Sequence, residues 1–141
     1  MSERIEQRHL LRAEPVPGEA VVVVRGGPNT LAKLRQHAAR TALLWDLDGE
    51  PLFGVSVFCA VDDVGPASLA GLLSRMNSYP IVHLTTVELL ERAGFELLAT
   101  ASRPHFTVRT VGAELDEIAS LLAVFGASRD NEYRSPRSGG R

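Results

Sequence analysis

The chain has 141 residues, which is long enough for one domain with a sizeable core. Fifteen basic and seventeen acidic residues give a formal net charge of −2, so the composition does not predict bulk attraction to nucleic acid or to an anionic membrane. No apolar stretch approaches the ~20 residues of a membrane span. The charged N-terminus lacks the apolar core of a signal peptide, and we therefore expect a cytoplasmic protein.

Composition along the chain divides it into three segments. Residues 1–19 are polar and interrupted by prolines, and we expect a short helical or irregular lead-in. Residues 20–126 contain the periodic apolar patterns of a single α+β domain. Residues 127–141 are rich in Gly, Ser and Arg, which predicts a disordered tail. Arginines around Tyr133 make that tail a candidate contact for RNA or for an acidic partner.

Apolar runs and alternation predict five strands, over residues 20–24, 51–61, 81–84, 95–101 and 105–111. The four valines at 21–24 have no polar residue between them, which is typical of a strand that is buried on both faces and central in its sheet. Short connections between successive strands favour antiparallel pairing. The sequence therefore predicts a mixed, largely antiparallel sheet of about five strands, packed by three to four helices.

Helical spacing of apolar residues predicts four helices, over residues 30–45, 66–79, 85–93 and 113–125, the second of which ends at Tyr79-Pro80. Asn29 or Thr30 is the expected N-cap of the first helix, and Thr85 with Glu88 has the pattern of a capping box for the third. The second helix carries a regular apolar stripe. As an alternative to an enzyme, that stripe would bury against a protein partner or a second copy of the chain in a non-catalytic assembly module.

Two histidines lie in the same local pattern, hydrophobic–His–hydrophobic–Thr, at His83 and His105. Alternation along the last strand places His105, Thr107 and Arg109 on one face, which we expect to be exposed. Histidine exchanges protons near neutral pH, while Arg and Thr hold anionic oxygens. We therefore expect His83 and His105 to act as general base and general acid, with Thr107 assisting and Arg109 binding phosphate.

The H-x-[ST] form occurs twice, in VHLTT and PHFTV, and resembles the signature of the 2H phosphoesterases, which process RNA ends and cyclic phosphates. The resemblance is confined to these two short motifs. They are 22 residues apart here, while that family sets them in two duplicated lobes. The leading hypothesis is a small bacterial, toxin-like ribonuclease or phosphoesterase that acts on RNA or a nucleotide without a metal or other cofactor.

Arg25 leaves the valine strand immediately before Gly26-Gly27 and a helix, where backbone N–H groups can face an anion. Arg25 is therefore a second candidate for phosphate binding. An arginine at the end of one strand with Ser56 on a later strand resembles the Arg–Ser–Glu plan of ADP-ribosyltransferases. That resemblance implies NAD as substrate, although Glu114 and Glu117 fit better as first-turn helix residues than as the glutamate of that plan.

Structural roles compete with chemical ones for several of these residues. His83 lies between two apolar neighbours and fits a hydrogen-bonded core histidine, and His37 lies at the border of the first long helix's apolar stripe. Cys59, the single cysteine, sits in an apolar strand and fits a buried thiol; its being alone excludes an intramolecular disulfide. The absence of H-E-x-x-H and C-x-x-C spacing argues against a structural zinc site.

Overall fold

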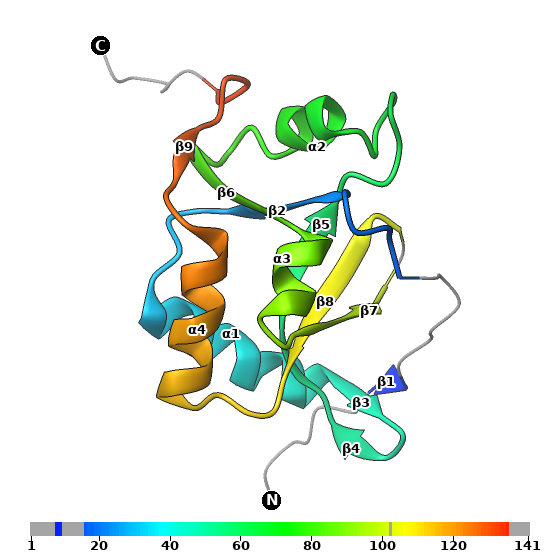
Figure 1. Ribbon diagram of the computed structural model, residues 1–141, viewed down its shortest axis with the longest axis vertical. Coiled ribbons are helices and arrows are strands. Elements are labelled where there is room, and N and C mark those ends of the chain that lie inside the picture. The colour runs from blue at the N-terminus through cyan, green and yellow to red at the C-terminus, as the bar shows by residue number, and fades with distance from the viewer. Residues whose placement is uncertain (1–7, 10–15, 102, 136–141) are drawn as a thin grey trace, which may run out of the picture.

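Six strands form one antiparallel sheet in the computed structural model, which describes residues 8–9, 16–101 and 103–135 (Figure 1). The strand order is β7-β8-β5-β2-β6-β9. Four helices pack against this sheet, which confirms the predicted α+β class. The strands of the sheet are β2 (Val22–Gly26), β5 (Phe53–Cys59), β6 (Ile81–Thr86), β7 (Glu96–Ala99), β8 (His105–Thr110) and β9 (Arg129–Asp130).

The predicted central strand is confirmed. β2 lies between β5 and β6, and both Val23 and Val24 are fully buried. Their side chains point to opposite faces, so each face of the sheet must be covered by apolar packing. This explains why the valine run shows no alternation between apolar and polar residues.

A second, smaller sheet flanks the first and was not predicted. It consists of three short strands, β1 (Arg8–His9), β3 (Trp45–Leu47) and β4 (Glu50–Pro51). β1 pairs in parallel with β3, so the lead-in expected to be helical or irregular contributes a strand. Residues 1–7 and 10–15 lie outside the described residues. The hairpin of β3 and β4 closes over one end of the large sheet, where Leu47 and Leu52 pack with Leu98.

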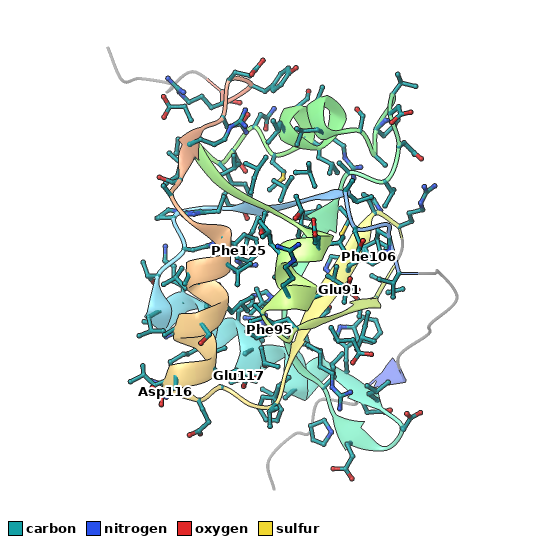
Figure 2. All side chains as sticks on the ribbon, in the orientation of Figure 1. Glu91, Phe95, Phe106, Asp116, Glu117 and Phe125 are labelled. Carbon is teal, nitrogen blue, oxygen red and sulfur yellow. The ribbon has the colours of Figure 1, made fainter. Side chains whose placement is uncertain are left out.

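The helices are α1 (Leu31–Leu44), α2 (Leu69–Arg75), α3 (Val87–Arg92) and α4 (Leu115–Phe125). α1, α3 and α4 share one core with the sheet, to which Phe95, Phe106 and Phe125 contribute the aromatic side chains (Figure 2). α2 covers the opposite face alone, through a separate apolar cluster. The sheet is therefore the middle layer, with most helical mass on one face and the single helix α2 on the other (Figure 1).

Capping follows the sequence prediction in part. Thr30 caps α1 by accepting a hydrogen bond from the Lys33 amide, as one of the two expected caps. α3 is capped by Thr86, not by Thr85. β6 runs two residues further than predicted, so Thr85 becomes a buried strand residue whose hydroxyl has no hydrogen-bond partner among the described residues. Gly94 follows α3 with a φ of +92°, as expected of a glycine after a helix end.

The apolar stripe of α2 packs inside the chain. Leu72, Leu73 and Met76 are buried against Val24 and Val82 of the sheet. The expectation that this stripe would face a protein partner or a second copy is therefore wrong, because β2 and β6 occupy it. The sequence pattern of an amphipathic helix does not distinguish an internal partner from an external one.

Part of the segment predicted as a disordered tail, residues 127–141, is ordered. β9 pairs with β6, and Asn131 is completely buried. The Asn131 side-chain amide donates to the carbonyl oxygens of Leu73 and Met76 at the end of α2. Residues 129–135 are thus part of the domain, and the remaining six residues, 136–141, lie outside the described residues. Within the described part of the chain, no helix has the length and apolar character required to cross a membrane.

Candidate functional site

A cleft opens where β2 separates from β5. The two strands pair only at Val23 with Cys59 and Val24 with Phe58, whereas β2 remains paired with β6 as far as Gly26. β2 and β6 therefore turn away from β5 and β8, as Figure 1 shows. α1 begins five residues after β2 ends and packs along β5 beyond the divergence. The cleft is bounded by the end of β2, the middle of β5 and the first half of α1.

Arg25 occupies the point of divergence. Its Nη1 donates to the Ser56 carbonyl oxygen at 2.7 Å, and its Nε donates to Asn29 Oδ1 at 3.1 Å. The guanidinium thus satisfies a carbonyl that a β2 amide would have paired had the strands stayed together. Burial lowers the pKa of Arg25, an effect that Tyr79 partly opposes. Arginine remains protonated at neutral pH, so the base of the cleft carries a fixed positive charge.

His37 and Ser56 form a hydrogen-bonded pair beside Arg25. Ser56 Oγ lies 2.9 Å from His37 Nε2. The pKa of His37 is lowered to about 4, first by burial and then by the positive charge of Arg25, with smaller contributions from His105 and Arg40. At neutral pH the ring is therefore uncharged and able to accept a proton. A hydroxyl next to an unprotonated imidazole is the arrangement that nucleophilic and general-base catalysis use.

The cleft has a volume of about 290 Å³ and combines positive charge with aromatic surface. Lys33 lies at its rim, and Phe58, Met76 and Tyr79 supply apolar walls. None of the lining residues is acidic. The lining residues are Arg25, Gly26, Gly27, Pro28, Lys33, His37, Ser56, Phe58, Met76 and Tyr79. Such a surface suits a ligand with an anionic group and a planar ring.

Two glycines after Arg25 allow side chains to approach the backbone closely. A Cβ at Gly26 would lie 2.6 Å from the Tyr79 ring, and a Cβ at Gly27 would lie 2.7 Å from the His83 ring. Tyr79 can therefore lie on the backbone of Gly26 as one wall of the cleft. The Gly26-Gly27 pair is required by packing at this position, in addition to its place before a helix.

The predicted row on β8 lies on one face of the sheet, but it is not an open surface. Its three members, His105, Thr107 and Arg109, pair in register with Phe58, Ser56 and Gly54. Thr107 is 1% exposed and bonds the Thr100 hydroxyl at 2.8 Å, so its predicted exposure is wrong. Arg109 is exposed and pairs with Glu96 at 3.4 Å. The hairpin of β3 and β4 and the end of α2 flank this face, which explains the burial of its middle.

His105 lies beside the cleft wall. Its Nδ1 is 2.7 Å from Thr100 Oγ1, and its ring meets the Phe58 ring edge-on at 5.6 Å between centroids. Burial lowers the pKa of His105, although a hydrogen bond to the Thr100 backbone opposes that shift. His105 does not line the cleft, but it fixes Phe58, which does.

His83 is separated from His105 and has a structural environment. Its Nε2 accepts a hydrogen bond from the Asn29 amide at 3.2 Å, and the residue is 7% exposed. Across the sheet, His105 pairs with Phe58, Phe58 with Val24 and Val24 with Leu84, so Leu84 lies on the same face as His105. His83 precedes Leu84 in the same strand and therefore points to the other face. The two strands are three spacings apart, roughly 14 Å at the usual separation. The expected convergence of His83 and His105 is therefore not found.

Sequence reasoning missed His37 as a site residue. The histidine that shares the Ser56 face with His105 is His37, from α1, and their interaction appears in the lowered pKa of His37. A signal was present, because Lys33, His37 and Arg40 recur at helical spacing on a stretch of α1 without an acidic residue. Tyr79 was taken only as the end of a helix.

The described residues contain no cluster of three or more His, Cys, Asp or Glu side chains that could hold a metal ion. Cys59 is fully buried, and burial raises the pKa of its thiol to about 12. The thiol is therefore protonated at neutral pH, which agrees with the predicted buried and unreactive cysteine.

Comparison of the chain with protein-family models, with curated proteins and with solved structures finds no match.

Proposed function

We propose that this protein is an enzyme that binds RNA or a nucleotide in the cleft and cleaves a phosphodiester bond with His37 as general base. The observation that carries this proposal is the Ser56–His37 pair placed directly beside the Arg25 guanidinium. Arg25 and Lys33 attract the phosphate, and the cleft lining contains no carboxylate to repel it. Phe58 and Tyr79 offer ring surfaces against which a base can pack.

In the proposed step, neutral His37 removes the proton from a ribose 2′-hydroxyl. The resulting oxygen attacks the adjacent phosphorus, the bond from phosphorus to the 5′-oxygen breaks, and the leaving oxygen takes a proton from water. The product strand ends in a 2′,3′-cyclic phosphate. Arg25 stabilises the negative charge that develops on the phosphate oxygens, because the guanidinium is already held in place by Ser56 and Asn29.

The bound phosphate also raises the pKa of His37. An anion beside the imidazole opposes the effect of Arg25, so the pKa of His37 rises from about 4 toward the range of an effective base. Nε2 of the ring bonds Ser56 Oγ, and the ribose 2′-hydroxyl replaces Ser56 Oγ as the partner of Nε2 when it delivers its proton. His105 and Thr107 then act behind the cleft wall, by fixing Phe58, and Arg109 lies outside it.

Cleavage of short single-stranded RNAs, followed by mass spectrometry of the products, tests the proposal. We expect 2′,3′-cyclic phosphate ends, no cleavage of RNA with 2′-O-methyl groups, and a loss of about 100-fold or more in His37→Gln. Arg25→Gln should lose both binding and cleavage. Arg92→Gln is the matched control, since Arg92 is exposed on α3 and, among the described residues, pairs with Glu88 alone. An unchanged rate in His37→Gln would contradict the assignment of the base.

A second candidate function is NAD binding for ADP-ribosyl transfer. The observation that favours it is the contact between Arg25 and Ser56, the two residues on which the resemblance to ADP-ribosyltransferases rests. The lining residues include no glutamate for the transfer step. Calorimetric titration with NAD, compared with AMP, separates the two candidates. Binding of NAD with release of nicotinamide supports ADP-ribosyl transfer, and tighter binding of AMP than of NAD supports the first proposal.

A further inference from the structure

A second hollow adjoins the cleft on the α2 side. It has a volume of about 100 Å³ and is lined by Phe58, Leu72, Arg75 and Met76. Phe58 and Met76 also line the larger cleft, so the two hollows share these side chains as a common wall. We propose that the two together bind two consecutive nucleotides of a single strand, the second one in contact with Arg75. This inference rests on the proposed function and names the length of its substrate.

Positive charge is the first argument. Arg75 is exposed in the last turn of α2, and no hydrogen bond or ion pair of its side chain is found among residues 8–9, 16–101 and 103–135. Arg25 lines the cleft and Arg75 lines the second hollow, while Phe58 and Met76 line both. Two cations separated by apolar side chains match two phosphates separated by a sugar and a base.

The wall between the hollows is the second argument. Phe58 is half-buried and held in its orientation by the edge-on contact with His105. His105 is in turn fixed by Thr100, whose hydroxyl also contacts Thr107. A ring that is held in one orientation loses little conformational freedom when a base stacks on it. The buried hydroxyls of Thr100 and Thr107 thus act on the ligand through His105 and Phe58.

The acidic side chains labelled in Figure 2, Glu91 on α3 and Asp116 and Glu117 on α4, belong to helices that pack on the opposite face of the sheet. Neither hollow has an acidic lining residue. In a chain of net charge −2, the linings of the two hollows are therefore locally positive.

The test compares the affinity of AMP with that of a 5′-phosphorylated diadenylate that carries 2′-O-methyl groups, so that His37 cannot start cleavage. We expect the dinucleotide to bind about tenfold more tightly than AMP in the unmodified protein, a ratio equivalent to one stacked base with its phosphate. In Arg75→Gln and in Phe58→Leu the ratio should fall to about one. Arg25→Gln should weaken both ligands, and Arg92→Gln should change neither.

The outcomes separate the two proposals. If AMP binds but the dinucleotide binds no more tightly, the second subsite is wrong while the nucleotide cleft stands. The same holds if Arg75→Gln leaves the ratio unchanged. If neither ligand binds, the proposed function fails, and the subsite fails with it. The melting temperature of each variant is measured in parallel, since Arg75 is exposed and its replacement should not alter it.

Discussion

His37 illustrates how much of the site depends on the surroundings of one residue. A free histidine titrates near pH 6.5, whereas burial and the charge of Arg25 lower the pKa of His37 to about 4. Between these two values the unfolded chain binds a proton at this position and the folded chain does not. The contribution of His37 to the free energy of unfolding is therefore fully present above pH 6.5, and it is lost as the pH falls toward about 4.

Two measurements check this prediction. The His37 ring proton signals in NMR should titrate near pH 4, and the free energy of unfolding by denaturant should fall from pH ~7.5 to pH ~5. His37→Gln keeps a hydrogen-bonding group for Ser56 but does not titrate, so its stability should fall less over the same interval. A His37 signal that titrates near pH 6.5 would show that the ring is not held in the cleft as described.

The residues that share a face within one strand could be predicted from the sequence, but the side chains that they contact on other elements could not. Alternation placed His105 and Thr107 on one face correctly, because the side-chain period of a strand is fixed. Which face of the sheet His83 points to depends on the register of β6 against β2, and no local sequence pattern determines that register. His37 comes from a helix, so its contact with Ser56 required knowledge of how α1 packs on β5.

At the scale of elements, the segment 129–135 supports the cleft through Asn131. Its side-chain amide donates to the carbonyls of Leu73 and Met76, and its side-chain oxygen accepts from the Tyr133 amide. These bonds fix the end of α2 and the loop that carries Tyr79 to the cleft. Asn131→Ala removes both buried hydrogen bonds and leaves the Met76 carbonyl with the Tyr79 amide as donor, which we expect to destabilise the fold by about 1–3 kcal/mol.

Denaturant unfolding measures that loss, and titration with AMP measures its effect on the cleft. Asn77→Ala is the matched control, because Asn77 lies in the same loop with an exposed side chain. It should change neither stability nor binding by a comparable amount. If Asn131→Ala lowers stability but AMP binds as before, Asn131 supports the domain without positioning the cleft.

Most elements were predicted, and the failures have a common cause. Strong periodicity located all four helices and five strands of the large sheet. β9 has only two residues, and the segment around it has the composition of a tail, so its pairing with β6 left no local pattern. The divergence of β2 from β5 could not be predicted either. It depends on the residue at which the two strands stop pairing, and the sequences of the strands do not show that residue.

At the scale of the whole molecule, the sheet separates two kinds of surface. One face is covered by three helices, two of which carry the acidic residues labelled in Figure 2. The other face is covered by α2. Arg25 of β2, Lys33 of α1 and Arg75 of α2 line the cleft and the hollow that adjoins it. The net charge of −2 therefore does not describe the local distribution of charge at the cleft, whose lining carries Arg25 and Lys33 and no acidic residue.

This distribution predicts a strong salt dependence of binding despite the negative net charge. Each phosphate neutralised on a single strand releases counterions and contributes about −0.7 to the slope of log affinity against log salt concentration. The slope for a 2′-O-methyl oligonucleotide, measured by fluorescence anisotropy from about 50 to about 200 mM salt, should be close to −2 for contacts at Arg25, Lys33 and Arg75. Arg75→Gln should make the slope less steep by about 0.7, whereas Arg92→Gln should leave it unchanged. A slope near zero would mean that apolar contacts with Phe58 and Tyr79 dominate, and that the cations of the cleft do not contact phosphates.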